Sequence, residues 1–187
     1  MTIPRCAHLV LLAAALLTVP RAIKAGELVI DRSQSHIDIA VKSTVDSFVA
    51  RLAAFDVTLK IDPTNGRVES GVFQADLAAV KTGRADRDSD MDRWLQTGKY
   101  PQVIFELTSV ERGPDGALSA RGRLQLHGQL RRIAFPVKIT AGPGGVTIDG
   151  TAALDTREYG LPVIRKFLVL TVDPVVQVRI HLQGKSD

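Results

Sequence analysis

The sequence is poor in three things: cysteine, aromatic side chains and long apolar runs. Its 187 residues include one cysteine, so no disulfide can form within the chain. No apolar run reaches the roughly 18 residues that a membrane-spanning helix needs, which argues against an integral membrane protein. Aromatic residues make up 5% of the chain and offer few platforms for stacking on nucleic-acid bases. The apolar share of 45% is nevertheless that of an ordinary globular protein.

Signatures of catalysis and metal binding are also missing. The chain has no G-x-S-x-G nucleophile elbow, no Walker loop and no G-x-G-x-x-G loop. His36, His127 and His181 lie in different segments without the spacing of a zinc motif, and we interpret them as exposed strand histidines. The sequence therefore predicts no catalytic residue, no cofactor and no metal. An enzyme acting on a lipid through His36, His127 or Asp155 is kept as an alternative.

The N-terminus has the pattern of an export signal. Arg5 precedes an apolar run over residues 9–19, and Pro20 and a small-residue exit at Ala25 follow it. We therefore predict a cleaved secretory signal peptide over residues 1–25 and a single domain over residues 26–187. An uncleaved membrane anchor is the alternative, although the run is shorter than the roughly 20 residues of a full span.

Much of the positive charge belongs to this N-terminal segment. The full chain has 24 Lys+Arg against 20 Asp+Glu, and residues 1–25 hold three of the cations and none of the acids. The remaining 21 against 20 is close to neutral, so nucleic acid is disfavoured as a partner. No pattern in the sequence points to a particular oligomeric state.

After residue 26 the dominant hydrophobic period is two, which is typical of strands with one apolar and one polar face. Turn-forming residues separate these runs at 63–66, 113–116 and 142–145, where glycine follows asparagine, aspartate or proline. Short alternating runs at this spacing favour an antiparallel sheet that is closed into a barrel or packed as a sandwich. A closed barrel of about eight strands is either filled by side chains or holds one small apolar ligand.

Two segments depart from the alternation. In residues 84–97, Met91, Trp94 and Leu95 recur at helical spacing, and Gly98 is expected to end this short helix. We interpret the helix as a plug at one end of the barrel, or alternatively as a lid over a ligand cavity. Its aspartates alternate with arginines, which is typical of an ion-paired helix face.

The pattern of residues 163–170 predicts a strand buried on both faces, or alternatively a loop that touches an anionic membrane through Arg165 and Lys166.

Five ordered motifs spread over residues 27–182 resemble the YceI-like family of lipocalin-like, polyisoprenoid-binding secreted proteins. They are Ile30-Asp31 with Ser35-His36-Ile37, Thr82-Gly83 with Asp86-Arg87-Asp88, Tyr100-Pro101 with Phe105, Gly122-x-Leu124-x-Leu126-His127-Gly128, and Asp155 to Gly160-Leu161. The resemblance implies an all-β fold, an extended eight-stranded antiparallel barrel with an elongated apolar cavity. It further implies a periplasmic protein that binds a polyisoprenoid, an isoprenoid quinone or a fatty-acid derivative without catalysis.

The alternation of the strands predicts which side chains would line such a cavity. The expected lining residues are Ile37, Ile39, Val41, Val103, Phe105, Leu124, Leu126, Phe135 and Val137. The residues expected to hold a lipid head group at one open end are Arg87, Trp94, Arg157 and Tyr159. Ordinary core packing is the alternative role for each lining residue. A filled barrel serving as a protein-interaction or stress-response module is the alternative function.

Overall fold

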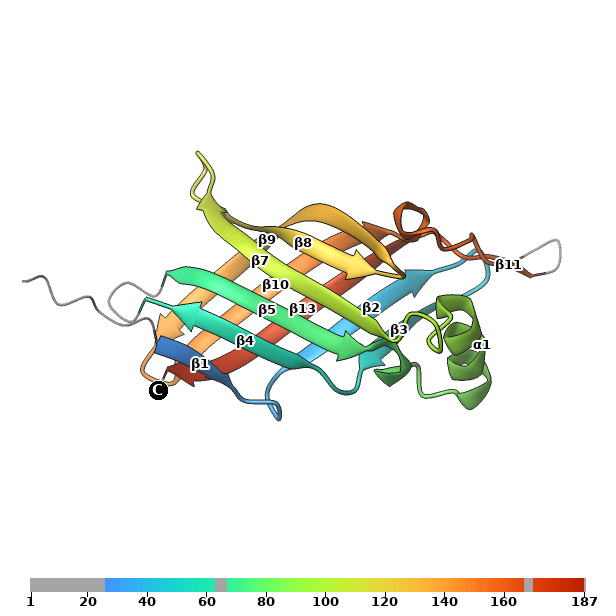
Figure 1. Ribbon diagram of the computed structural model, residues 1–187, viewed down its shortest axis with the longest axis horizontal. Coiled ribbons are helices and arrows are strands. Elements are labelled where there is room, and N and C mark those ends of the chain that lie inside the picture. The colour runs from blue at the N-terminus through green and yellow to red at the C-terminus, as the bar shows by residue number, and fades with distance from the viewer. Residues whose placement is uncertain (1–25, 63–66, 167–169, 187) are drawn as a thin grey trace, which may run out of the picture.

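The computed structural model describes residues 26–62, 67–166 and 170–186. These residues form strands, one α-helix and two short 3-10 helices (Figure 1). The strands of the first half are β1 (Gly26–Ile30), β2 (His36–Lys42), β3 (Ser47–Leu52), β4 (Asp56–Ile61), β5 (Val68–Asp76) and β6 (Val80–Lys81). Those of the second half are β7 (Gln102–Arg112), β8 (Leu118–Leu126), β9 (Gln129–Gly142), β10 (Gly145–Asp155), β11 (Arg165–Lys166), β12 (Leu170–Thr171) and β13 (Val175–Ser186). The helices are η1 (Leu77–Ala79), α1 (Ala85–Leu95) and η2 (Thr156–Tyr159).

Eight antiparallel strands close into a barrel. The order around the wall is β1-β4-β5-β7-β8-β9-β10-β13, and β13 pairs back with β1 to complete the ring. The short strands β2, β3 and β6 continue this wall, because β2 pairs with β13 beyond β1, β3 pairs with β2, and β6 pairs with β3. The predicted eight-stranded antiparallel barrel with one short helix is confirmed.

The two ends of the barrel differ. α1, β11 and the turn between β2 and β3 lie at one end, on the right of Figure 1, and the C-terminus lies at the other. At the C-terminal end, the predicted turn at 113–116 joins β7 to β8 through a Gly113 N–H donated to the Ala117 carbonyl at 2.8 Å. The predicted turn at 142–145 joins β9 to β10. The predicted turn at 63–66 lies outside the described residues.

Three local expectations need correction. α1 ends at Leu95, not at Gly98, because Gln96 adopts the left-handed conformation (φ 51°) that glycine usually supplies at a helix end. Residues 163–170 do not form a strand buried on both faces: their described part contributes β11 and the first residue of β12, which pair with each other over two residues, and Arg165 is exposed. Residues 167–169 of that segment lie outside the described residues. His127 is buried in a turn with positive φ, not exposed on a strand.

A close approach inside the wall requires glycine at position 122. A Cβ atom at Gly122 would lie 2.4 Å from the Glu106 carbonyl oxygen and 2.5 Å from the Phe105 ring. Because a backbone oxygen in a paired strand cannot move aside, we expect Gly122→Ala to lower the free energy of unfolding by about 1–3 kcal/mol in urea denaturation. Gly144→Ala is the matched control, since a Cβ there would meet nothing within 4 Å. Equal stabilities of the two variants would contradict this account.

Candidate functional site

The barrel encloses a cavity of about 270 Å³ that is lined almost entirely by apolar side chains. Among the described residues that line it, Thr156 alone carries a hydroxyl, amide or charged group, and its hydroxyl already donates to the Pro174 carbonyl at 3.0 Å. An apolar cavity of this kind stays dry and accepts apolar guests. The protein's own side chains therefore do not fill the barrel, contrary to the filled-barrel alternative.

The cavity runs along the barrel. At the C-terminal end it is lined by Val68, Val110 and Leu182, which lie near the ends of β5, β7 and β13. At the other end it reaches the apolar stripe of α1, so the helix closes the barrel and lines the cavity at the same time. The stripe consists of Met91, Trp94 and Leu95.

Among the described residues no helix is both long and apolar enough to cross a bilayer.

All nine side chains that alternation placed inside line this cavity. They are Ile37, Ile39, Val41, Val103, Phe105, Leu124, Leu126, Phe135 and Val137. Their contact with a lipid stays a prediction. Alternation failed at β7, where a register shift between Leu107 and Ser109 puts both Leu107 and Val110 on the lining, three residues apart. A bulge of this kind leaves no signal in the hydrophobic period.

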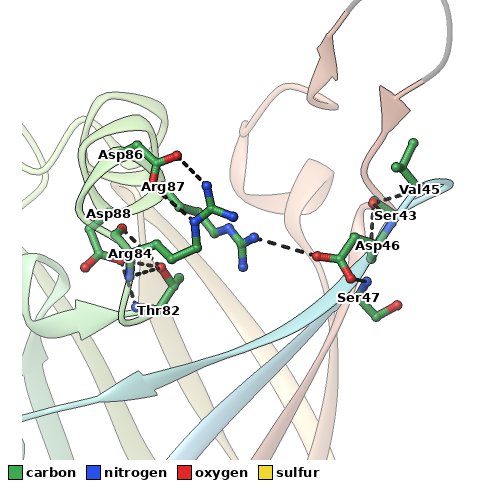
Figure 2. Close-up of polar contacts among 9 residues, drawn as sticks. All are labelled: Ser43, Val45, Asp46, Ser47, Thr82, Arg84, Asp86, Arg87 and Asp88. Atoms are coloured by element: carbon green, nitrogen blue, oxygen red, sulfur yellow. Dashed lines mark hydrogen bonds and ion pairs between the residues drawn. The ribbon is translucent and has the colours of Figure 1, made fainter.

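The motif at residues 82–88 anchors the start of α1. The Thr82 amide and hydroxyl both donate to the Asp88 carboxylate, at 2.8 and 2.6 Å. These hydrogen bonds hold the pKa of Asp88 below its usual range, because they favour the charged carboxylate. Arg84 pairs with Asp86 in the same turn (Figure 2). The charged residues of this motif thus hold the helix across the end of the barrel.

Arg87 links α1 to the turn between β2 and β3. Its guanidinium lies 4.1 Å above the centre of the Phe48 ring and 3.7 Å from the Asp46 carboxylate. Figure 2 shows α1 on one side, the turn on the other and this ion pair between them. Arg87 does not line the main cavity, but it covers Phe48, which lines a smaller hollow beside it.

That smaller hollow lies beside the main cavity at the α1 end of the barrel. It has a volume of about 50 Å³ and shares Val41, Met91 and Trp94 with the main cavity. Its outer side is formed by Phe48 and by residues 162–164 and 172–174. We call this region the mouth. The Trp94 Nε1–H donates to the Pro162 carbonyl at 2.8 Å, so α1 is tied to both sides of the mouth.

The other two head-group candidates lie elsewhere. Arg157 binds the Asp155 carboxylate through Nε and Nη2, and it lines neither hollow. Tyr159 is 1% exposed, packs with Leu95 and Leu126 in the core, and is absent from the lining of both hollows. Within the described residues its hydroxyl has no hydrogen-bond partner, and burial raises the pKa of Tyr159 to about 12. The structure thus places Tyr159 behind the cavity wall and not at the mouth.

The histidines and Asp155 do not converge on one site. His36 and His181 face each other on the outside of the barrel, with ring centres 5.0 Å apart, and His181 Nδ1 lies 2.7 Å from the Asp149 carboxylate. His127 is buried, with Nδ1 3.0 Å from the Tyr159 carbonyl oxygen. Among the described residues no group of three or more His, Cys, Asp or Glu side chains is placed to hold a metal ion.

An antiparallel barrel around an elongated apolar cavity defines a lipocalin-like binding protein. Residues 28–184 match the YceI-like domain, and the chain belongs to the YceI-like family. A UPF0312 protein of Vibrio cholerae is 28% identical over 182 residues, which cover 91% of this chain and 93% of the relative. One from Shewanella denitrificans is 34% identical over 139 residues, which cover 70% of this chain and 69% of that one.

Solved structures share the fold at low sequence identity. BcnA of Burkholderia cenocepacia superposes with a TM-score of 0.72 at 18% identity, covering 82% of this chain and 98% of BcnA. A polyisoprenoid-binding domain of Saccharophagus degradans, implicated in plant cell wall breakdown, superposes with a TM-score of 0.67 at 15% identity. That alignment covers 88% of this chain and 100% of the domain.

Proposed function

We propose that this protein binds a long-chain apolar lipid in its barrel and carries it through the periplasm without chemical change. The lipid classes that fit are a polyisoprenoid, an isoprenoid quinone and a fatty-acid derivative. The observation that carries the proposal is the cavity of about 270 Å³, whose polar side chains among the described residues, Thr156 and Trp94, are both already hydrogen-bonded. The polyisoprenoid-binding domain with the same fold supports it.

The physical reason is the aqueous insolubility of such a tail. Each CH₂ group that leaves water for the cavity contributes roughly 0.8 kcal/mol to the binding free energy. Burial of several isoprene units therefore suffices for tight binding. Among the described residues that line the cavity, no side chain is a carboxylate, imidazole, thiol or amine, and the Thr156 hydroxyl is held by the Pro174 carbonyl. A polar head group is expected at the mouth. Arg87 lies in the first turn of α1 and Trp94 in its last turn. Transient contact of this end with a membrane surface would load the lipid.

Trp94 provides a direct test, because it is the only tryptophan and lines both the cavity and the mouth. Titration with an isoprenoid quinone is expected to quench its fluorescence saturably. The same quinone head group without its isoprenoid tail is expected to leave the fluorescence unchanged, because binding comes from burial of the tail.

The bound lipid can also be identified without choosing a ligand beforehand. The protein purified from its own periplasm should release a stoichiometric long-chain lipid on extraction with organic solvent and mass spectrometry. Repeated recovery of no lipid, together with unchanged Trp94 fluorescence in the quinone titration, would contradict the proposed function. A specific protein partner found by cross-linking in that case would favour the interaction-module alternative.

A further inference from the structure

The wall of the barrel is interrupted between β9 and β10. The two strands pair only from Gly142 opposite Gly145 to Val137 opposite Gly150. Beyond that point β9 continues to pair with β8, and β10 continues to pair with β13, but they no longer pair with each other in the described residues. We call this interruption the seam. Its two edges are residues 129–136 of β9 and residues 151–155 of β10. In Figure 1 the β8–β9 hairpin arches away from β10 toward the α1 end.

The sequence explains where the seam begins. Continuing the register by one residue would place Pro136 opposite Thr151. Proline has no N–H to donate to a ladder and is confined to strand edges, so pairing stops there. Gly150 is the last residue of β10 that pairs with β9, and a Cβ atom on it would lie 3.2 Å from the Phe135 ring. The aromatic ring therefore packs over the glycine at the point where the strands separate.

Side chains alone close the seam. On its inner side Ile133 and Phe135 of β9 and Ala152 and Leu154 of β10 all line the cavity, and they pack in one cluster. On its outer side Ala134 and Ala153 are small and exposed, and the larger Leu130 and Arg132 nearer the β8–β9 turn are exposed as well. Here a layer of apolar packing, without a backbone hydrogen-bond ladder, separates the cavity from solvent.

The wide end of the seam is covered by η2. This helix leaves β10 and returns to the β8–β9 turn, where His127 Nδ1 lies 3.0 Å from the Tyr159 carbonyl oxygen. The Arg131 Nε–H donates to the Glu158 carbonyl at 3.1 Å. The Tyr159 side chain fills the space beneath η2, yet its hydroxyl and His127 Nε2 have no partner among the described residues. Buried polar atoms without partners weaken the closed position relative to one in which they are hydrogen-bonded.

We infer that the seam is a lateral opening through which the hydrocarbon tail of the lipid enters and leaves the barrel. The inference rests on the proposed function and adds the route. When η2 lifts with Tyr159, the side chains of β9 and β10 separate without breaking a ladder between these strands. Because the seam extends from Pro136 to the end of the barrel that carries the mouth, a lipid head group can stay at the mouth while its tail swings sideways into the cavity.

A reversible cross-link across the seam tests this route. Continuing the register of β9 and β10 places Ala134 opposite Ala153, and both are exposed and outside the cavity lining. In a Cys6→Ser background, which removes the only native thiol, the pair Ala134→Cys and Ala153→Cys would close the seam. The matched control is Thr140→Cys with Thr147→Cys, which joins the same two strands where they are already paired. If the seam thiols lie too far apart to oxidise, a short bismaleimide joins them instead.

The measurement is the rate at which each protein takes up an isoprenoid quinone from phosphatidylglycerol vesicles, followed by Trp94 fluorescence. The closed seam is expected to slow uptake by at least about ten-fold, because opening of the gate would then limit the rate of exchange. Reduction of the disulfide, or omission of the bismaleimide, should restore the rate, and the control should match the unmodified chain. An unchanged rate with the seam closed and quinone still bound would overturn the lateral route alone. Absence of quinone binding by the unmodified chain would overturn the proposed function, and the route with it.

Discussion

Replacement of Ala152 by phenylalanine is expected to weaken lipid binding about 200-fold and to leave the barrel folded. Ala152 is 5% exposed and lines the middle of the cavity beside Phe135 and Ala120. A ring at this position would take space from the tail. Exclusion of about four CH₂ groups at roughly 0.8 kcal/mol each corresponds to a loss of affinity of about 200-fold. The fold should tolerate the ring at a cost of about 1–3 kcal/mol, because the ring extends into the cavity and only its contact with Phe135 is crowded.

Ala153→Phe is the matched control for this variant. Ala153 is the next residue of the same strand, points to the outside and is exposed. Quinone titration of both variants through Trp94 fluorescence measures the affinity, and urea denaturation measures the stability. Equal affinities of the two variants would show that the tail does not occupy this part of the barrel.

Replacement of Tyr159 should separate the contribution of its ring from that of its hydroxyl. The residue is 1% exposed and packs with Leu95 and Leu161 beneath η2. Tyr159→Ala is expected to lower the free energy of unfolding by about 3–5 kcal/mol, as for other large aromatic side chains removed from a core. Tyr159→Phe should leave it unchanged or raise it by about 1 kcal/mol, because the hydroxyl it removes has no partner among the described residues. A large loss in Tyr159→Phe would reveal a hydrogen bond to this hydroxyl.

The same residue predicts an alkaline weakness of the fold. An unfolded tyrosine has a pKa of about 10, and burial raises the pKa of Tyr159 to about 12. Between these values the folded protein holds a proton that the unfolded chain has lost, so stability falls as the pH rises from about 10 to 12. The full effect of this difference is about 3 kcal/mol. Urea denaturation at pH 8 and pH 11 should show the loss in the unmodified chain and in Tyr100→Phe. In Tyr159→Phe the Tyr159 contribution to this loss should be absent.

Much of the fold could be predicted from the sequence, because each strand carries its own two-residue period. Ile37 and Leu124 are typical: their neighbours are polar, and the structure places their side chains in the cavity. The helix could be predicted from the spacing of Met91 and Trp94. The match of the YceI-like domain to residues 28–184 confirms the family that the ordered motifs suggested.

The site itself was less predictable, because it depends on contacts between residues far apart in the chain. Tyr159 stands beside exposed charged residues in the sequence, but η2 folds it under the β8–β9 turn against His127. Arg157 and Arg87 look alike in the sequence, yet one pairs with Asp155 and the other reaches Phe48 and Asp46. No local pattern distinguishes these outcomes.

The sequence by itself determined that the chain after residue 25 forms antiparallel strands with one aliphatic face each, because alternation is a local property of each strand; the closed barrel was implied by the resemblance to the YceI-like family. Only the tertiary structure decided that the barrel is hollow and that its wall is interrupted where Pro136 would face Thr151. The void depends on how the volumes of side chains from all eight strands add up. The seam depends on which backbone groups of two strands meet, and both are properties of the assembled barrel.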